Sequence, residues 1–337
     1  MELNGNGAYA LELQGVNHHY GTRQILFDLN LKLPPNRIYG LLGRNGAGKT
    51  TLINLISAQI FQSFGKIGAN SGRDPGQTLV FGEKTFENRH ALKRICVVRE
   101  KTNMPDSLRV YQAIKAAAMF YPNWDSEYAQ HLLDRFALDR KKRYKSLSRG
   151  MESALGLVIG LASRAELTIF DEPSLGLDAA AREYFYDELI HDFEAHPRTV
   201  IISTHMIDEV SRLFEDVVIM DKGRIKLHMS LDELMSNAVT VAGARDEVER
   251  QTAGLKLLHE ETLTGALEAQ AMGINDAEPT PISPAEFNER AQNRAQTGML
   301  LRSVWVPEGH KFEPGVELYP IPLQKLFVYL TEGGAGA

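Results

Sequence analysis

The chain has 337 residues, of which 43% are hydrophobic and 24% charged, and its formal net charge is −6. This length allows about two domains, and the acidic balance argues against a nucleic-acid partner, which needs a basic face. No apolar run reaches the ~18 residues that a membrane-spanning helix requires. The N-terminus lacks the basic start and apolar stretch of a secretory signal, and the single Cys96 fits a reducing compartment, so we expect a cytosolic protein.

The first two thirds of the chain alternate between strand-like and helix-like patterns. Strands are predicted at Tyr9–Val16, Ile25–Leu33, Glu166–Asp171, Arg198–Ser203, Val217–Met220 and Arg224–Met229. Helices are predicted after the glycine-rich Gly43–Thr50, between Val110 and Asp139 with a break near Asn123, at Ala179–Ala195 and at Met206–Phe214. Strands that alternate with helices imply an α/β fold with a largely parallel sheet and helices on its faces.

The character of the sequence changes after Asn237. Strands are predicted at Ala238–Gly243 and Leu255–Leu267, a helix start at Asp246–Gln251, a helix opened by the capping box Ser283–Glu286, and a short apolar helix at Leu323–Leu330. We therefore predict a separate small α+β domain over residues 238–337.

A phosphate-binding loop is the most informative motif. Gly43–Thr50 reads GRNGAGKT, the G-x-x-x-x-G-K-T pattern, between a strand-like run and a helix-like run. Its glycines let backbone N–H groups point inward and form a nest for oxyanions at the helix start. Lys49 can reach the outer phosphates of a nucleotide, and the Thr50 hydroxyl can ligate Mg²⁺. An accidental glycine-rich loop is the alternative, and the strand and helix flanks argue against it. The predicted ATP-binding residues here are Gly43, Arg44, Asn45, Gly46, Ala47, Gly48, Lys49, Thr50 and Thr51.

Two acidic residues end the predicted strand at Glu166–Asp171. Asp171 can hold Mg²⁺, through water or together with Thr50, and Glu172 can polarise a water for attack on the γ-phosphate. A carboxylate pair at a strand end is common and by itself fits a solvated strand end. It becomes informative because it follows a phosphate loop and precedes PSLGLD at Pro173–Asp178.

His205 follows the next predicted strand, so we expect it near the same phosphate. It could donate a hydrogen bond to the γ-phosphate and sense whether that group is present. A purely structural histidine near a strand end is the alternative reading.

Leu147–Met151 reads LSRGM, which by itself indicates only a serine cap and a glycine before a long helix. Its position before the Asp171–Glu172 strand, together with the phosphate loop, completes a family pattern. Over residues 8–236 the chain resembles the nucleotide-binding subunit of an ATP-binding-cassette (ABC) transporter. The resemblance implies a P-loop NTPase fold with a RecA-like core, an antiparallel β subdomain and a helical subdomain.

The resemblance also implies roles for individual residues. The LSRGM segment stands where the family has its LSGGQ signature, which faces the phosphate loop of a second cassette. Ser148 and the N–H of Gly150 would then contact the γ-phosphate held by the opposing chain, with Arg149 and Met151 beside them. Tyr20 matches the aromatic residue that stacks on adenine, although a hairpin packing role is the alternative. Asp178 matches the acidic residue of the loop that communicates across the dimer.

Two positions depart from the family pattern. Glu100 stands where the family has a glutamine; its carboxylate could ligate Mg²⁺ but adds negative charge near the phosphates. In the signature, Arg149 replaces a glycine and Met151 a glutamine, while Ser148 and Gly150 remain. These variants resemble a bacterial group of single-cassette subunits that carry a C-terminal extension and pair with separately encoded membrane proteins.

The sequence therefore predicts an ATPase that uses ATP and Mg²⁺ to power a transporter, with export favoured. Its expected partners are a second cassette, in a homodimer or heterodimer, and separate transmembrane subunits that hold it at the inner face of the membrane. No nucleic acid is expected. An ABC ATPase acting on ribosomes or nucleic acid, and a small-molecule kinase, are the alternatives. The 238–337 domain is predicted to have an accessory, regulatory or dimer-supporting role.

Overall fold

The computed structural model describes residues 9–61, 76–99, 104–263, 299–307 and 309–331. The chain divides into two compact units, Met1–Ser230 and Leu231–Ala337. Helix α8 (Leu231–Ser236) falls in the second unit because it packs against β11 (Ala238–Ala244) of that unit.

A six-stranded sheet forms the centre of the first unit, with the strand order β10-β9-β3-β8-β7-β6. Five of these strands run parallel, and β10 pairs antiparallel with β9. The strands are β3 (Ile38–Gly43), β6 (Ile95–Arg99), β7 (Leu167–Asp171), β8 (Thr199–Thr204), β9 (Asp216–Asp221) and β10 (Arg224–Ser230). The central strands β3, β7, β8 and β9 are buried at every position, as expected for parallel strands covered on both faces.

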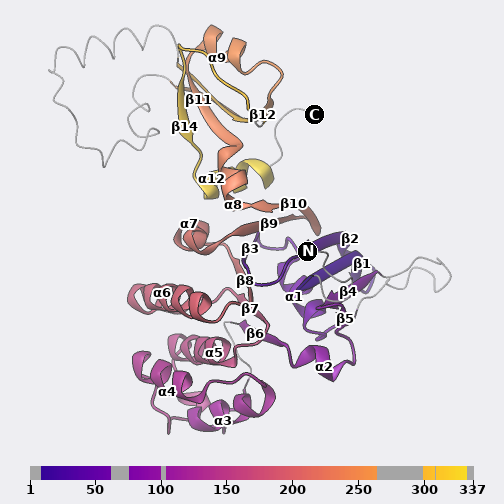
Figure 1. Cartoon of the computed structure of the whole chain (residues 1–337), viewed down its shortest axis with the longest axis vertical. Helices are drawn as coiled ribbons and strands as arrows, with labels where there is room; N and C mark the ends of the chain where they lie inside the picture. Colours follow the sequence, from indigo (N-terminus) through magenta and orange to yellow (C-terminus); the bar gives the residue numbers. More distant parts are fainter. Residues whose placement is uncertain (1–8, 62–75, 100–103, 264–298, 308, 332–337) are drawn as a thin grey trace, which may run out of the picture. The chain divides into compact units, whose positions relative to one another are not determined.

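A second, antiparallel sheet has the order β2-β1-β4-β5. Its strands are β1 (Leu11–Tyr20), β2 (Arg23–Leu33), β4 (Gln77–Val80) and β5 (Glu83–Lys84). Helix α1 (Lys49–Ile56) lies between the two sheets (Figure 1). Leu52, Ile53 and Ile56 of α1 share one apolar core with side chains of both sheets, such as Leu31 and Ile169. The helix that follows the phosphate loop is therefore held from two sides.

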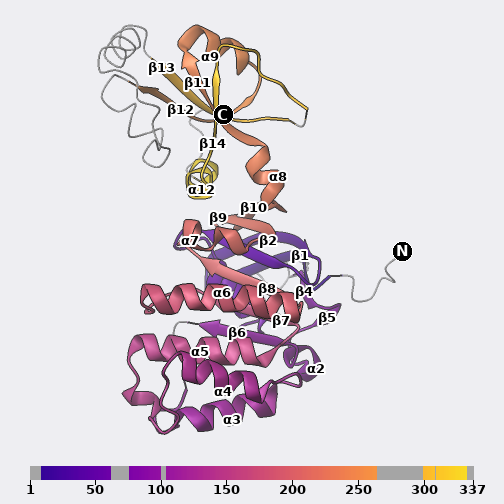
Figure 2. The same ribbon diagram turned by 60° about the vertical axis from the view of Figure 1, so that its left-hand side comes forward.

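The other helices of this unit lie on the opposite face of the parallel sheet, as Figures 1 and 2 show. They are α3 (Val110–Phe120), α4 (Ser126–Arg135), α5 (Arg149–Ser163), α6 (Ala179–Ala195) and α7 (Ile207–Val210), while α2 (Arg89–Leu92) precedes β6. Helix α5 packs against β6 and β7 and against α3, α4 and α6. Gly160 permits this contact, because a Cβ there would lie 2.5 Å from Val98 and 2.7 Å from Phe170.

One predicted helix is shorter than the pattern suggested. The segment Met206–Phe214 forms only α7 and a 3-10 turn at Ser211–Leu213. The Thr204 hydroxyl accepts the Met206 N–H at 3.0 Å, and the Phe214 N–H is donated to the Ser211 carbonyl at 3.1 Å, so tight turns occupy both ends.

The second unit contains a four-stranded antiparallel sheet with the order β12-β13-β11-β14. Beside β11, its elements are β12 (Lys256–Leu263), β13 (Met299–Trp305), β14 (Glu317–Pro320), α9 (Arg245–Gln251) and α12 (Leu323–Thr331). Val248 of α9 packs on Val241, Leu300, Val304 and Val306 to form its core. The helix predicted after Ser283 lies outside the described residues.

Gly223, in the turn between β9 and β10, offers a test of this packing. Its φ is +75°, and a Cβ there would lie 1.9 Å from the Ile25 carbonyl oxygen. Gly223→Ala should therefore lower the free energy of unfolding by about 2–4 kcal/mol, from left-handed strain and overpacking together. Gly21→Ala is the matched control, since Gly21 also has a positive φ of +60° but nothing within 4 Å of the added atom. Equal losses in denaturant titrations of the two variants would contradict this account.

Candidate nucleotide-binding site

The ends of three neighbouring parallel strands bring the predicted motifs together. In the strand order β3-β8-β7, Leu42 pairs with Thr204 and Ser203 pairs with Asp171. The phosphate loop follows β3, His205 follows β8, and Glu172 follows β7. Because parallel strands end at the same edge of a sheet, the loop, the histidine and the two carboxylates lie at one edge.

Glycine geometry shapes the phosphate loop. Gly46 and Gly48 have φ values of +82° and +103°, which other residues rarely adopt. A Cβ on Gly48 would also lie 2.7 Å from Leu26 of β2. The motif's glycines are therefore needed both for the turn and for the close approach of the antiparallel sheet.

A turn far away in sequence braces this loop. Gly223, between β9 and β10, donates its N–H to the Ala47 carbonyl at 3.0 Å and accepts from the Phe27 N–H at 2.9 Å. The loop is thus tied to both sheets. The sequence predicts the strands on both sides of this turn, but nothing in the local sequence indicates that the turn supports the phosphate loop.

The start of α1 differs from the starts of α4, α5 and α6. In the described part of the chain, no side chain caps α1, whose N-cap is Gly48. Side chains of Asp125, Ser148 and Asp178 cap α4, α5 and α6. The first-turn N–H groups of a helix have no partner within the helix, and its dipole favours anions there. This end of α1 is therefore suited to hold phosphate oxygens.

Lys49 is buried at this position, with 7% of its surface exposed. Its ammonium group donates to the carbonyl oxygen of Gly43. Burial lowers the pKa of Lys49, and the nearby charges of Glu172 and Asp171 oppose that shift. A phosphate group would provide the same kind of compensation as these carboxylates.

Asp171 is buried at the end of β7, with 8% of its surface exposed. Burial raises the pKa of its carboxyl group, against the Ser203 side chain and the charges of Arg99 and Lys49. Arg99 lies opposite Asp171 on the neighbouring strand β6. Sequence reasoning missed both Arg99 and Ser203 as neighbours of Asp171, because only the strand order brings them together.

Glu172 has a left-handed backbone, with φ of +53°. This conformation costs a non-glycine residue on the order of 1–3 kcal/mol and is often found at functional sites. The Glu172 N–H is donated to the Ser203 carbonyl at 2.8 Å, which helps to hold it. Nδ1 of His205 donates to Oε2 of Glu172 at 2.8 Å, so the two predicted catalytic side chains are in direct contact.

The predicted signature residues begin α5, away from the phosphate loop's helix. Helix α1 packs against β2, β3 and β4, whereas α5 packs on β6, β7 and other helices. Ser148 caps α5, but its oxygen accepts the Met151 N–H at the long distance of 3.4 Å. Ser148 and Arg149 are exposed and Gly150 and Met151 half-exposed, so this turn is accessible to a ligand or a partner.

The other predicted site residues differ in their exposure to solvent and in their local contacts. Asp178 caps α6 by accepting the Ala181 N–H at 2.8 Å, so it has a local structural role as well. Tyr20 is 49% exposed at the end of β1, with its ring 4.7 Å from and nearly perpendicular to the His18 ring. Of the loop residues, Arg44, Asn45 and Thr50 are exposed, Ala47 is buried and Thr51 is half-exposed. Glu100 lies outside the described residues.

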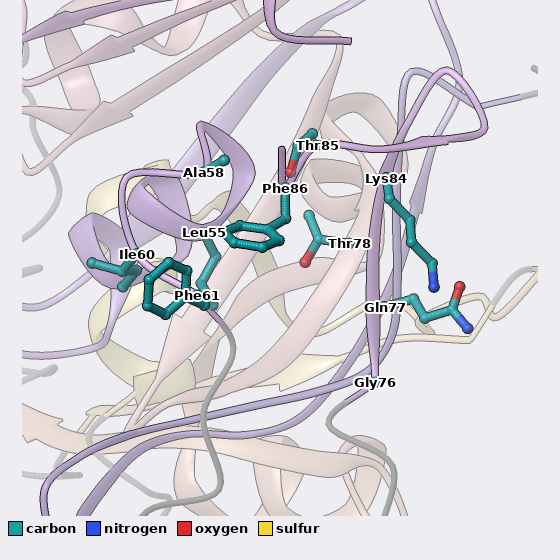
Figure 3. Close-up of a pocket in the computed structure, with 10 residues that line it drawn as sticks. All are labelled: Leu55, Ala58, Ile60, Phe61, Gly76, Gln77, Thr78, Lys84, Thr85 and Phe86. Carbon is teal, nitrogen blue, oxygen red and sulfur yellow. The ribbon is translucent and has the colours of Figure 1, made fainter. Parts of the chain in front are cut away.

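A pocket of about 380 Å³ lies elsewhere, between the end of α1 and the strands β4 and β5. Figure 3 shows Phe61 and Phe86 on its wall, and their rings meet edge to face at 4.9 Å. None of the predicted ATP-binding residues lines it. The candidate nucleotide site at the strand edge is therefore separate from this pocket.

Comparisons with known proteins relate the chain to one family. The family model described as ABC transporter matches residues 26–175. The chain is 27% identical to the ABC transporter ATP-binding protein YtrB of Bacillus subtilis over 70% of this chain and 77% of that protein. It is 30% identical to the Nod factor export ATP-binding protein I of Rhizobium johnstonii over 64% of this chain and 67% of that protein.

The chain belongs to the ABC transporter family. A dimeric ATP-binding cassette in a post-hydrolysis state with ADP and Pi has the same fold, with a TM-score of 0.55 at 20% identity over 66% of this chain and 98% of that one. The predicted α/β P-loop cassette and ATPase activity coupled to transport are thereby confirmed. The relatives do not favour an ATPase that acts on ribosomes or nucleic acid.

The raised pKa of Asp171 predicts that this residue lowers the stability of the folded protein, and that the effect depends on pH. With a folded-state pKa above the ordinary 3.8, the neutral carboxyl stabilises the fold at low pH, and that stability is lost as pH rises through the folded pKa. Asp171→Asn should therefore raise the unfolding temperature of the nucleotide-free protein at pH 7, and the gain should shrink toward pH 3.8.

Asp134→Asn provides the control with opposite sign. A hydrogen bond from Arg140 lowers the pKa of this exposed carboxyl, so its loss should leave stability unchanged or slightly lower at pH 7. Calorimetric melts of both variants across pH check the prediction. A lower unfolding temperature for Asp171→Asn at pH 7 would contradict it.

Proposed function

We propose that two cassettes close on ATP at this site and that hydrolysis reopens them, driving a separate membrane subunit. The observation that carries the proposal is the meeting of the uncapped α1, Lys49, Asp171 and the Glu172–His205 pair at one strand edge. Anion-binding groups, a carboxylate and a base–histidine pair are the parts that phosphoryl transfer to water needs.

Within one cassette, the α1 start and Lys49 would hold the β- and γ-phosphates. Thr50 and Asp171 would hold Mg²⁺; their hydroxyl and carboxylate oxygens are the hard donors this ion prefers, and bound Mg²⁺ would neutralise charge on the phosphates. Among the residues described, no group of three or more His, Cys, Asp or Glu is arranged so that it could hold a metal ion by itself.

Glu172 would accept a proton from the attacking water, and His205 would hold Glu172 in position and contact the γ-phosphate. The 2.8 Å contact between them supports these joint roles, because it fixes the carboxylate at the edge where the phosphates would lie. Tyr20, half-exposed at the end of β1, would stack on the adenine.

The second cassette would supply the signature turn. Ser148 and the Gly150 N–H lie at an exposed helix start, which favours anions, and the long Ser148 cap can be exchanged for a phosphate contact. One chain holds a complete set of residues for both halves, so a homodimer would have two competent sites. Pairing with a different cassette is the other arrangement that this turn allows.

A groove of about 580 Å³ on the first unit could receive part of a membrane partner. It lies between α3, α5 and the end of β6, with Ala117, Phe120 and Ile159 among its lining residues. Phe120 is 68% exposed and the adjacent Met119 is 80% exposed. Arg99, the partner of Asp171 on β6, also lines the groove, so an occupant would reach the strand that adjoins the nucleotide site.

We propose that this occupant is an apolar segment of a transmembrane subunit, which would hold the cassette peripherally at the inner face of the membrane. In the described residues, no helix is long and apolar enough to cross a bilayer. The Nod factor export relative supports export as the direction. For residues 238–337 we propose an accessory role in regulating or supporting the dimer, since they make up most of the compact unit Leu231–Ala337.

Glu172→Gln tests the catalytic assignment. The amide cannot accept the proton, so turnover should fall by a factor on the order of 10²–10⁴, while ATP binding persists and dimers accumulate. Steady-state ATPase assays and light scattering with ATP and Mg²⁺ measure the two effects.

Lys49→Ala is the companion variant. We expect it to weaken ATP binding, whereas Glu172→Gln should impair only the hydrolysis step that follows binding. Loss of one charged hydrogen bond, about 1.5–3 kcal/mol, corresponds to roughly 10–150-fold weaker ATP binding. Wild-type turnover in Glu172→Gln would remove Glu172 from its role, and unchanged ATP affinity in Lys49→Ala would remove the phosphate role of the lysine.

Phe120→Asp tests the groove. A charge at this apolar position should release most of the chain from the membrane fraction of the source cells, consistent with losing about 2 kcal/mol at an interface anchor. Tyr111→Asp is the matched control, because Tyr111 is 48% exposed on the same helix but does not line the groove. Equal sedimentation of the two variants with membranes would argue against docking here, provided that both keep basal ATPase activity.

A further inference from the structure

The signature turn makes an unusually close contact inside its own chain. A Cβ on Gly150 would lie 2.6 Å from the carbonyl oxygen of Gly176, in the turn before α6. A Cβ on Gly176 would in turn lie 3.0 Å from Cγ of Arg149. The close approach of the two backbones therefore requires a glycine at position 150, and at position 176 the φ of +86° favours glycine.

One side-chain hydrogen bond closes this contact. Ser153, on the first turns of α5, donates its hydroxyl to the Leu175 carbonyl at 2.7 Å. Ser153 is only 3% exposed, so water cannot easily replace the bond. We call Gly150, Ser153, Leu175 and Gly176 the signature junction.

The signature junction continues to the catalytic carboxylate. The Leu175 N–H is donated to the Glu172 carbonyl at 3.3 Å, while the Leu175 carbonyl accepts from Ser153. One peptide segment therefore connects Glu172 with α5. In the proposed function, Glu172 acts on the nucleotide bound by its own chain, and the start of α5 contacts the nucleotide bound by the opposing chain. A shift of either end would be transmitted to the other, because packed backbones leave no room for independent movement.

We propose that Ser153 is a positioning residue that fixes the signature turn relative to Glu172 and so couples the two nucleotide sites of the closed dimer. This rests on the proposed function, in which the signature turn acts on the opposing chain. Because it is buried, Ser153 itself would not contact ATP or the attacking water. It acts by keeping Ser148 and Gly150 in register with the catalytic strand of the same chain.

Ser153→Ala tests the proposal in the full-length chain. The maximal ATPase rate should fall roughly tenfold, since small misplacements of phosphate-contacting groups reduce rates by such factors. ATP-driven dimerisation of the Glu172→Gln background should weaken when Ser153→Ala is added. Binding of a fluorescent ATP analogue to the single chain should not change, because Lys49 and the α1 start are untouched.

Ser163→Ala is the matched control. Ser163 lies on the same helix, is completely buried, donates its hydroxyl to the Gly160 carbonyl at 2.8 Å and accepts the Ala165 N–H at 3.3 Å, but neither partner belongs to the signature junction. Both variants should lose similar thermal stability, and only Ser153→Ala should lose turnover. A purely structural role for Ser153 would lower the unfolding temperature without this difference in rate.

Gly176→Ala is a second variant that stresses the same contact from the other side. It should lower the maximal rate as Ser153→Ala does, whereas Gly254→Ala, at a φ of +80° with nothing within 4 Å, should not. Equal maximal rates for Ser153→Ala and Ser163→Ala, or a loss that follows nucleotide affinity, would overturn the role of the signature junction. Failure of Glu172→Gln itself to dimerise with ATP would overturn the proposed function, and this inference with it.

Discussion

The burial of α1 between two sheets is the constraint on which the rest of this cassette depends. Its apolar side chains join both sheets in one core, and its N-terminus meets the end of β3 without a capping side chain. A helix held so firmly can present uncapped N–H groups and a buried lysine without losing its fold. Leaving these N–H groups and the lysine without an anion is energetically unfavourable. Packing elsewhere offsets this, including the Gly223 turn, which is hydrogen-bonded to the loop.

The charges at the strand edge follow the same logic. Burial lowers the pKa of Lys49 and raises that of Asp171, so each is held where its charged form is disfavoured without a partner of opposite sign. They partly compensate each other, and a nucleotide with its cation would complete the compensation. Glu172 adds a strained backbone and a direct contact with His205. Nucleotide binding at this edge would relieve these unfavourable charge and backbone energies, which is how binding energy can drive a change of shape.

In the proposed function, the surfaces around this edge connect it to other molecules. The exposed start of α5 suits a phosphate that its own loop does not hold, and the apolar groove beside β6 suits a membrane subunit. The signature junction links the first of these surfaces to Glu172, and Arg99 lies between the groove and Asp171. An ATPase that drives a transporter needs such links, because hydrolysis at the nucleotide site must alter contacts at the surfaces that bind other subunits.

The sequence by itself determined the parallel α/β core, the phosphate loop, the Asp171–Glu172 strand end, and the change of character after Asn237. These are local patterns: strand periodicity, glycines that permit a turn, and acids that follow an apolar run. It missed Gly223, Arg99, Ser203 and Ser153 because their partners Ala47, Asp171 and Leu175 are distant in sequence or lie across a turn. Only the tertiary structure decided these contacts, since strand order and helix packing, which arise from the whole core, determine which strand ends become neighbours.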